Sequence, residues 1–96
     1  MTKIATYVGP GHSDRADQRI YRLDPPISWI DLFADRTRTS EYVVVSAVDH
    51  SFATETYIFP SDKEGTITNW GELDGSFKGG VDHERALRRA GYEVAS

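Results

Sequence analysis

Three histidines, each with an acidic residue nearby in the chain, are the first groups in this sequence that could do chemistry: His12, His50 and His83. Imidazole and carboxylate groups hold a metal ion only when several of them converge at about 2 Å. None of the spacings around these histidines matches a zinc or a calcium motif. We therefore expect surface or helix-capping roles and no bound metal, while a single metal site at one of the three histidines stays open.

A glycine-rich segment, residues 75–80, invites comparison with phosphate-binding loops because it precedes a predicted helix. Backbone N–H groups at the start of a helix attract anions. The G-x-x-x-x-G-K-[ST] spacing is absent, however, and Asp82 at the expected helix start would repel a phosphate. We interpret the segment as a turn that sets the entry angle of the helix.

Candidate catalytic groups are few. No serine lies in the G-x-S-x-G pattern of a nucleophile elbow. Glu55 shares one face of a predicted strand with Ala53, Tyr57 and Phe59, and burial of that face would raise the pKa of its carboxyl group. The more ordinary interpretation is a strand-edge glutamate that reaches solvent or pairs with an arginine. The sequence therefore predicts no catalytic residue and no cofactor, and it favours a protein that is not an enzyme.

Large aromatic residues in predicted loops and short elements are candidates for a binding surface: Trp29, Phe52, Trp70 and Phe77. Aromatic residues are enriched in protein interfaces, and tryptophan and tyrosine in their energetic centres. Such residues also pin loops onto the core of a small domain. Both interpretations stay open from the sequence.

Three arginines on the predicted last helix form a second candidate surface: Arg85, Arg88 and Arg89. They could present a positive stripe, or they could complement the negative end of the helix dipole. They are the one hint of nucleic-acid binding. The chain as a whole carries 11 basic and 15 acidic residues, a net charge of −4, and lacks the basic footprint that nucleic acids require. We expect a protein partner rather than a nucleic acid.

Length and composition predict a single globular domain over residues 1–96. The absence of cysteine excludes disulfides and thiolate sites. No apolar run approaches the roughly 18 residues of a membrane span, and the first residues lack the apolar region of a signal peptide. We expect a soluble intracellular protein with no membrane association.

The elements that position these residues are predicted to be strands and one helix. Apolar patterning predicts strands over 3–8, 19–23, 41–48 and 53–59. The strand over 41–48 is apolar on both faces, which indicates a central strand covered on both sides.

Prolines and helix-capping residues predict where the elements end and begin. Pro25, Pro26 and Pro60 are expected to end strands. Ser28 with Asp31 predicts one or two helical turns over 28–34. Asp82 predicts the start of a C-terminal helix that ends before Gly91. The expected fold is α+β: a mainly antiparallel sheet of four or five strands with one C-terminal helix packed on a face.

Several runs of the sequence resemble small uncharacterised proteins of actinobacterial phages, mycobacteriophages in particular. The runs are YVVVSAV at 42–48, ETYIFP at 55–60, WGELDGS at 70–76 and GGVDH at 79–83, followed by the alanines, Leu87, Gly91 and Tyr92 of the last helix. The resemblance implies a phage-encoded product that acts in an infected bacterium or is built into the virion. It implies no activity and no catalytic residue.

Taken together, these features predict a phage-encoded, non-enzymatic protein-binding module that acts on a host protein in the cytoplasm of the infected bacterium. One alternative is a structural or decoration protein of the virion, which would be a symmetric homo-oligomer. A second alternative is a small enzyme or a nucleotide- or metal-binding protein. The sequence leaves the oligomeric state open.

Overall fold

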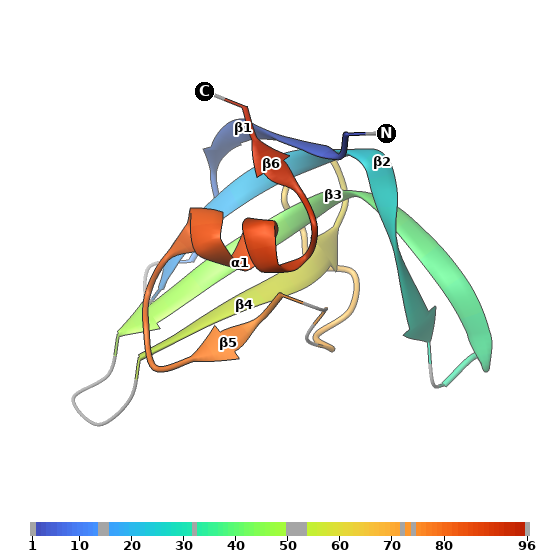
Figure 1. Ribbon diagram of the computed structural model, residues 1–96. Helices are drawn as coiled ribbons and strands as arrows, with labels where there is room; N and C mark the ends of the chain where they lie inside the picture. Colours follow the sequence, from blue (N-terminus) through green and yellow to red (C-terminus); the bar gives the residue numbers. More distant parts are fainter. Residues whose placement is uncertain are drawn as a thin grey trace.

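One curled sheet accounts for most of the chain, which we describe from a computed structural model over residues 2–13, 16–31, 33–49, 54–71, 73 and 75–95. In chain order the elements are β1 (Ile4–Pro10), β2 (Asp17–Asp31), β3 (Arg36–Asp49), β4 (Thr54–Ser61), β5 (Phe77–Lys78), α1 (His83–Arg89) and β6 (Glu93–Val94). The strand order across the sheet is β5-β4-β3-β2-β1-β6 (Figure 1). Strands β1 and β6 are parallel, and the other neighbours are antiparallel.

The predicted fold class is wrong. We expected an α+β fold with four or five mainly antiparallel strands and a C-terminal helix packed on a face. The structure is mostly sheet, with six strands of mixed direction curled into a half-barrel and one short helix among the described residues. Strands β5 and β6 have two residues each. The sequence does not predict β5, but it favours Glu93 and Val94 as an addition to a sheet edge, and β6 confirms this. A strand of two residues is too short to show an alternation of apolar and polar side chains. Both strands form because they pair with a longer strand beside them, β5 with β4 and β6 with β1.

The prolines do not end the strands as predicted. Strand β2 runs through Pro25 and Pro26, and its register with β3 shifts between Arg22 and Ile27. A proline cannot donate to a ladder, but an irregularity of this kind needs no donor there. Pro60 likewise lies inside β4, one residue before its end.

The helical turns predicted over 28–34 are also wrong. Residues Ser28–Asp31 belong to β2 and pair with Arg36–Thr39 of β3. Strand pairing therefore overrides the Ser28–Asp31 spacing that is typical of a helix start. The strands predicted over 3–8, 19–23 and 41–48 are confirmed, and the one over 53–59 is confirmed from Thr54 onward. The sequence also predicts a hairpin loop at 49–52, of which residues 50–52 lie outside the described part of the chain.

The main core lies between the sheet and α1. Val43 and Val45 of β3, Ile58 of β4, and Ala86 and Leu87 of α1 are completely buried in one cluster. Burial of each valine, isoleucine or leucine side chain in this cluster contributes about 1.5–3 kcal/mol. This cluster joins the helix to the middle of the sheet.

The opposite face of β3 is covered as well, which confirms the prediction of a central strand. Val44 is completely buried and pairs with Ile20 on β2 and Phe59 on β4. The segment after β4 folds over this face, because the Thr68 backbone N–H donates to the Pro60 carbonyl and the Trp70 ring stands 5.2 Å from the Phe59 ring.

Helix α1 begins and ends as the sequence predicts. The Asp82 side chain accepts a hydrogen bond from the Arg85 backbone N–H, and Gly91 takes a positive φ of 97°. The Tyr92 N–H donates to the Leu87 carbonyl, which completes a Schellman ending. No helix in the described residues is long and apolar enough to cross a membrane.

Candidate functional site

A two-stranded arm projects from the sheet and is the most distinctive feature of the surface (Figure 1). Strand β1 pairs with β2 as far as Asp24, and β4 pairs with β3 as far as Tyr42. Strands β2 and β3 continue together beyond these points, from the pair Ile27–Ser40 to the pair Asp31–Arg36. The arm therefore leaves the sheet with no other described strand beside it.

The turn at the tip of the arm is held by Asp31. One carboxylate oxygen accepts hydrogen bonds from the backbone N–H groups of Phe33 and Ala34, at 3.1 and 3.2 Å. The other accepts from Arg38 Nε at 2.6 Å. The bond from Ala34, together with Arg38, holds the pKa of the Asp31 carboxyl group below its ordinary value. An ionised Asp31 thus fixes the conformation of the turn.

This turn presents apolar side chains to solvent. Phe33 is fully exposed, and Ile30 is 69% exposed. A fully exposed phenylalanine buries no apolar surface within its own chain, so the tip of the arm is a candidate contact surface. Neither residue is among the binding residues that the sequence predicted.

The base of the arm is anchored to the core. Trp29 is half-buried against the core cluster, and its Nε1 donates to Ser40 Oγ at 2.9 Å. The Tyr92 hydroxyl donates to the Pro25 carbonyl at 2.6 Å, and burial raises the pKa of this phenol. Trp29, predicted as a binding residue, therefore stiffens the arm and lines a cleft of about 660 Å³ between the arm and the Ser61–Thr68 segment.

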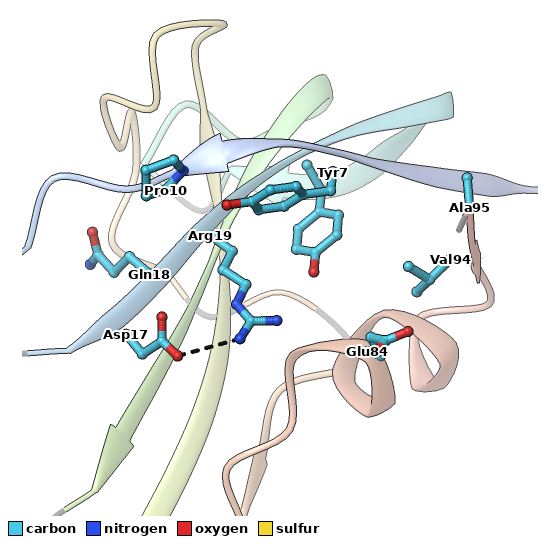
Figure 2. A pocket seen from close by; sticks show the side chains of 9 residues that line it. Tyr7, Pro10, Asp17, Gln18, Arg19, Glu84, Val94 and Ala95 are labelled. Atoms are coloured by element: carbon cyan, nitrogen blue, oxygen red, sulfur yellow. Dashed lines mark ion pairs between the residues drawn. The ribbon is translucent and has the colours of Figure 1, made fainter.

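A second cleft, of about 550 Å³, lies between β1, β2 and the helix (Figure 2). Arg19 extends into it, with 3.6 Å between its Nη2 and Asp17 Oδ2. Burial lowers the pKa of Arg19, but a hydrogen bond with Tyr21 and the charge of Asp17 outweigh this effect and leave the pKa raised. Burial raises the pKa of Tyr21. The cleft thus holds one ion pair, between Arg19 and Asp17, and the carboxylate of Glu84 lines it as well.

The other predicted aromatic residues lie in different surroundings. Trp70 is 69% exposed, although one edge contacts Phe59. Phe77 is half-buried and packs against the core. Phe52 lies outside the described residues. No ring contact joins any two of Trp29, Trp70 and Phe77, so these residues do not form a single aromatic patch.

The three predicted arginines are all exposed, and two of them share a partner. The guanidinium groups of Arg85 and Arg89 stand 4.9 and 5.6 Å from the centre of the Phe77 ring. Arg88 makes no such contact in the described part of the chain. Glu55, considered as a buried acid, lies near Lys78 Nζ at 4.0 Å and accepts a hydrogen bond from the Tyr57 hydroxyl.

The histidines have backbone partners. His12 Nε2 donates to the Glu64 carbonyl at 2.6 Å, and His83 Nε2 donates to the Asp17 carbonyl at 2.7 Å. His50 lies outside the described residues. Among the residues that are described, no three histidine or carboxylate side chains gather in a way that could hold a metal ion.

Comparison of the chain with protein-family models, with curated proteins and with solved structures gives no match. The phage resemblance therefore stays a prediction.

The sequence also carries a signal for the hairpin at the tip, which the helical interpretation of residues 28–34 missed. The β-branched Thr37 and Thr39 alternate with Arg36 and Arg38, a pattern typical of a strand with one face in solvent. A hairpin at this point places Phe33 on a turn instead of on the face of a helix.

Proposed function

We propose that this protein is a non-enzymatic protein-binding module that inserts the tip of its β2–β3 arm into an apolar pocket of a partner protein. The observation that carries the proposal is the fully exposed Phe33 on a turn that Asp31 holds in place. Burial of one phenylalanine side chain contributes about 1.5–3 kcal/mol to binding. That contribution is large enough for a single residue to dominate a small interface.

The rigidity of the arm supports this proposal. Asp31 orders the tip, and Trp29 and Tyr92 anchor the base. A contact element that is ordered before binding loses less conformational entropy when the complex forms. The same exposed residues on a flexible loop would bind more weakly.

The positive charge of Arg36 at the tip indicates which charge the partner's pocket should carry. Arg36 is exposed beside the turn, and no carboxylate among the described residues forms an ion pair with it. The partner's pocket should therefore be apolar at its base and carry a carboxylate at its rim.

We propose that the partner is a protein of the bacterial host, on the basis of the resemblance to proteins of actinobacterial phages. The alternative is that the arm binds a second copy of this chain or a neighbouring subunit in the virion.

The test compares three tagged proteins in lysate of an actinobacterial host: the native sequence, Phe33→Ser and Val81→Ser. Val81 is an exposed apolar residue far from the arm in sequence, so its substitution is a matched control. We expect one host protein to be retained at stoichiometric yield by the native and Val81→Ser proteins and lost from Phe33→Ser. Equal retention by all three proteins would exclude the arm as the contact surface.

Two further results would redirect the proposal. Recovery of the protein at a fixed copy number in purified virions would make it a structural component. A dimer or larger oligomer in solution that Phe33→Ser dissociates would show that the arm binds a second copy.

A further inference from the structure

Two guanidinium groups stand over one aromatic ring at the edge of the sheet. Arg85 and Arg89 lie one helical turn apart on α1, which places both side chains on the same side of the helix. Their Cζ atoms are 4.9 and 5.6 Å from the centre of the Phe77 ring, within the range of a cation–π contact. The two charges are therefore held close together by a shared platform.

The Phe77 ring, which both guanidinium groups share, is held in place by the fold. Phe77 pairs with Thr56 in the sheet and packs against the core cluster. A Cβ atom on Gly80 would lie 3.0 Å from Cε2 of the ring, so the backbone comes close to the ring on that side. A ring enclosed in this way restricts both arginine side chains, and less entropy is lost when they bind.

The arginines are not neutralised within the described chain. None of the carboxylates that form ion pairs there, on Asp17, Asp31, Glu41 and Glu55, pairs with Arg85, Arg88 or Arg89. The nearby Asp82 carboxylate accepts from the Arg85 backbone N–H. Lys78, beside Phe77 in β5, is 76% exposed and forms an ion pair with Glu55 at 4.0 Å. The charges that no described carboxylate pairs with on this surface are therefore those of Arg85, Arg88 and Arg89, on a chain whose net charge is −4.

We infer that Arg85, Arg89 and Phe77 form a binding site for an acidic protein segment, separate from the arm. A guanidinium group binds a carboxylate through two parallel hydrogen bonds, and two such groups side by side fit two carboxylates of one peptide. A single-stranded nucleic acid fits less well, because it binds by stacking its bases on aromatic rings, and the guanidinium groups of Arg85 and Arg89 already stand over the Phe77 ring.

The test measures fluorescence anisotropy of a labelled peptide of alternating aspartate and glutamate added to the full-length protein. A serine–glycine peptide and a single-stranded DNA of equal length serve as comparison probes. We expect the acidic peptide to bind best, with an affinity that falls as salt is added. Arg85→Gln and Arg89→Gln should each weaken binding about tenfold, as expected for loss of one charged hydrogen-bonding group.

Arg88→Gln is the matched control, because Arg88 is on the same helix and does not contact the ring. It should change the affinity less than twofold. An equal loss in Arg88→Gln, stronger binding of the DNA, or no salt-dependent binding of the acidic peptide would each overturn the inference. Phe33→Ser should leave this affinity unchanged, so failure here and failure of the arm proposal are distinguishable.

Discussion

Asp31 and Arg38 meet across the arm, with 2.6 Å between Oδ2 of the carboxylate and Nε of the guanidinium. They are diagonal neighbours, because Asp31 pairs with Arg36 and Arg38 pairs with Trp29. The second oxygen of Asp31 accepts from the backbone of Phe33 and Ala34. One carboxylate therefore joins both strands of the arm to the turn that presents Phe33.

Replacement of Asp31 by asparagine should loosen the tip while leaving the sheet intact. The substitution removes the ion pair with Arg38 and weakens the bonds to the turn. Amide hydrogen exchange at Phe33 and Ala34 should become about tenfold faster, as expected when one charge-assisted hydrogen bond is lost. Asp35→Asn is the control, since Asp35 lies in the same turn at a φ of 50° that asparagine tolerates. Equal acceleration in both variants would contradict this role of Asp31.

The stability of the protein should fall in acid partly through Asp31. Its pKa in the folded state is lowered, first by the hydrogen bond from Ala34, so the folded state favours the ionised carboxylate. The resulting stabilisation is complete above the unfolded-state pKa, near 4, and is lost as the pH falls through the lowered folded-state pKa. Urea unfolding across this range should show a steeper decline for the native protein than for Asp31→Asn. Parallel curves would rule out a contribution from this residue.

Phe33→Ser should leave the free energy of unfolding unchanged within about 0.5 kcal/mol, because a fully exposed side chain loses no buried contacts. Leu87→Ala, at a completely buried position of α1, should cost about 2–5 kcal/mol. Urea unfolding of both variants measures these changes in the free energy of unfolding. Strong destabilisation by Phe33→Ser would mean that Phe33 is a core residue and not a contact residue.

Gly75→Ala and Gly79→Ala should differ in cost although both positions have a positive φ. A Cβ atom at Gly75 would lie 2.5 Å from the Ala86 carbonyl oxygen, whereas a Cβ atom at Gly79 would meet nothing within 4 Å. Gly79→Ala should therefore cost about 1 kcal/mol of backbone strain, and Gly75→Ala about 1–3 kcal/mol more for the clash with the helix. Thermal unfolding measures the difference, and equal costs would show that α1 does not approach Gly75 this closely.

Tyr92→Phe should destabilise the base of the arm by about 0.5–1.5 kcal/mol, because it removes the hydrogen bond to the Pro25 carbonyl and keeps the ring. Tyr7→Phe is the control at a half-exposed tyrosine and should change stability by less than about 0.5 kcal/mol. Denaturant midpoints compare the two variants. A neutral Tyr92→Phe would indicate that water replaces the hydroxyl at Pro25.

Elements with a strong local pattern were predictable. Val43, Val44 and Val45 are apolar on successive positions, and burial on both faces follows because a strand alternates sides with each residue. Asp82 and Gly91 bound α1 through bonds within a few residues of each other, so neighbouring residues alone specify that helix. That Phe77 lies beneath Arg85 and Arg89 could not be predicted, because β5 reaches this place only by pairing with β4.

The arm and the mixed sheet depended on contacts that no local pattern contains. Residues 28–31 carry a helix-start spacing, yet they form a strand because β3 supplies a partner from Arg36 to Thr39. Strand β6 exists because Glu93 and Val94 return beside Ile4 and Ala5, at the other end of the chain. By itself, the sequence determined the central strand, through its apolar periodicity, and the capped helix, through hydrogen bonds between residues close in the chain. Tertiary structure alone decided the fold class and the exposure of Phe33, because strand pairing joins residues distant in the chain and its energy exceeds a weak local preference.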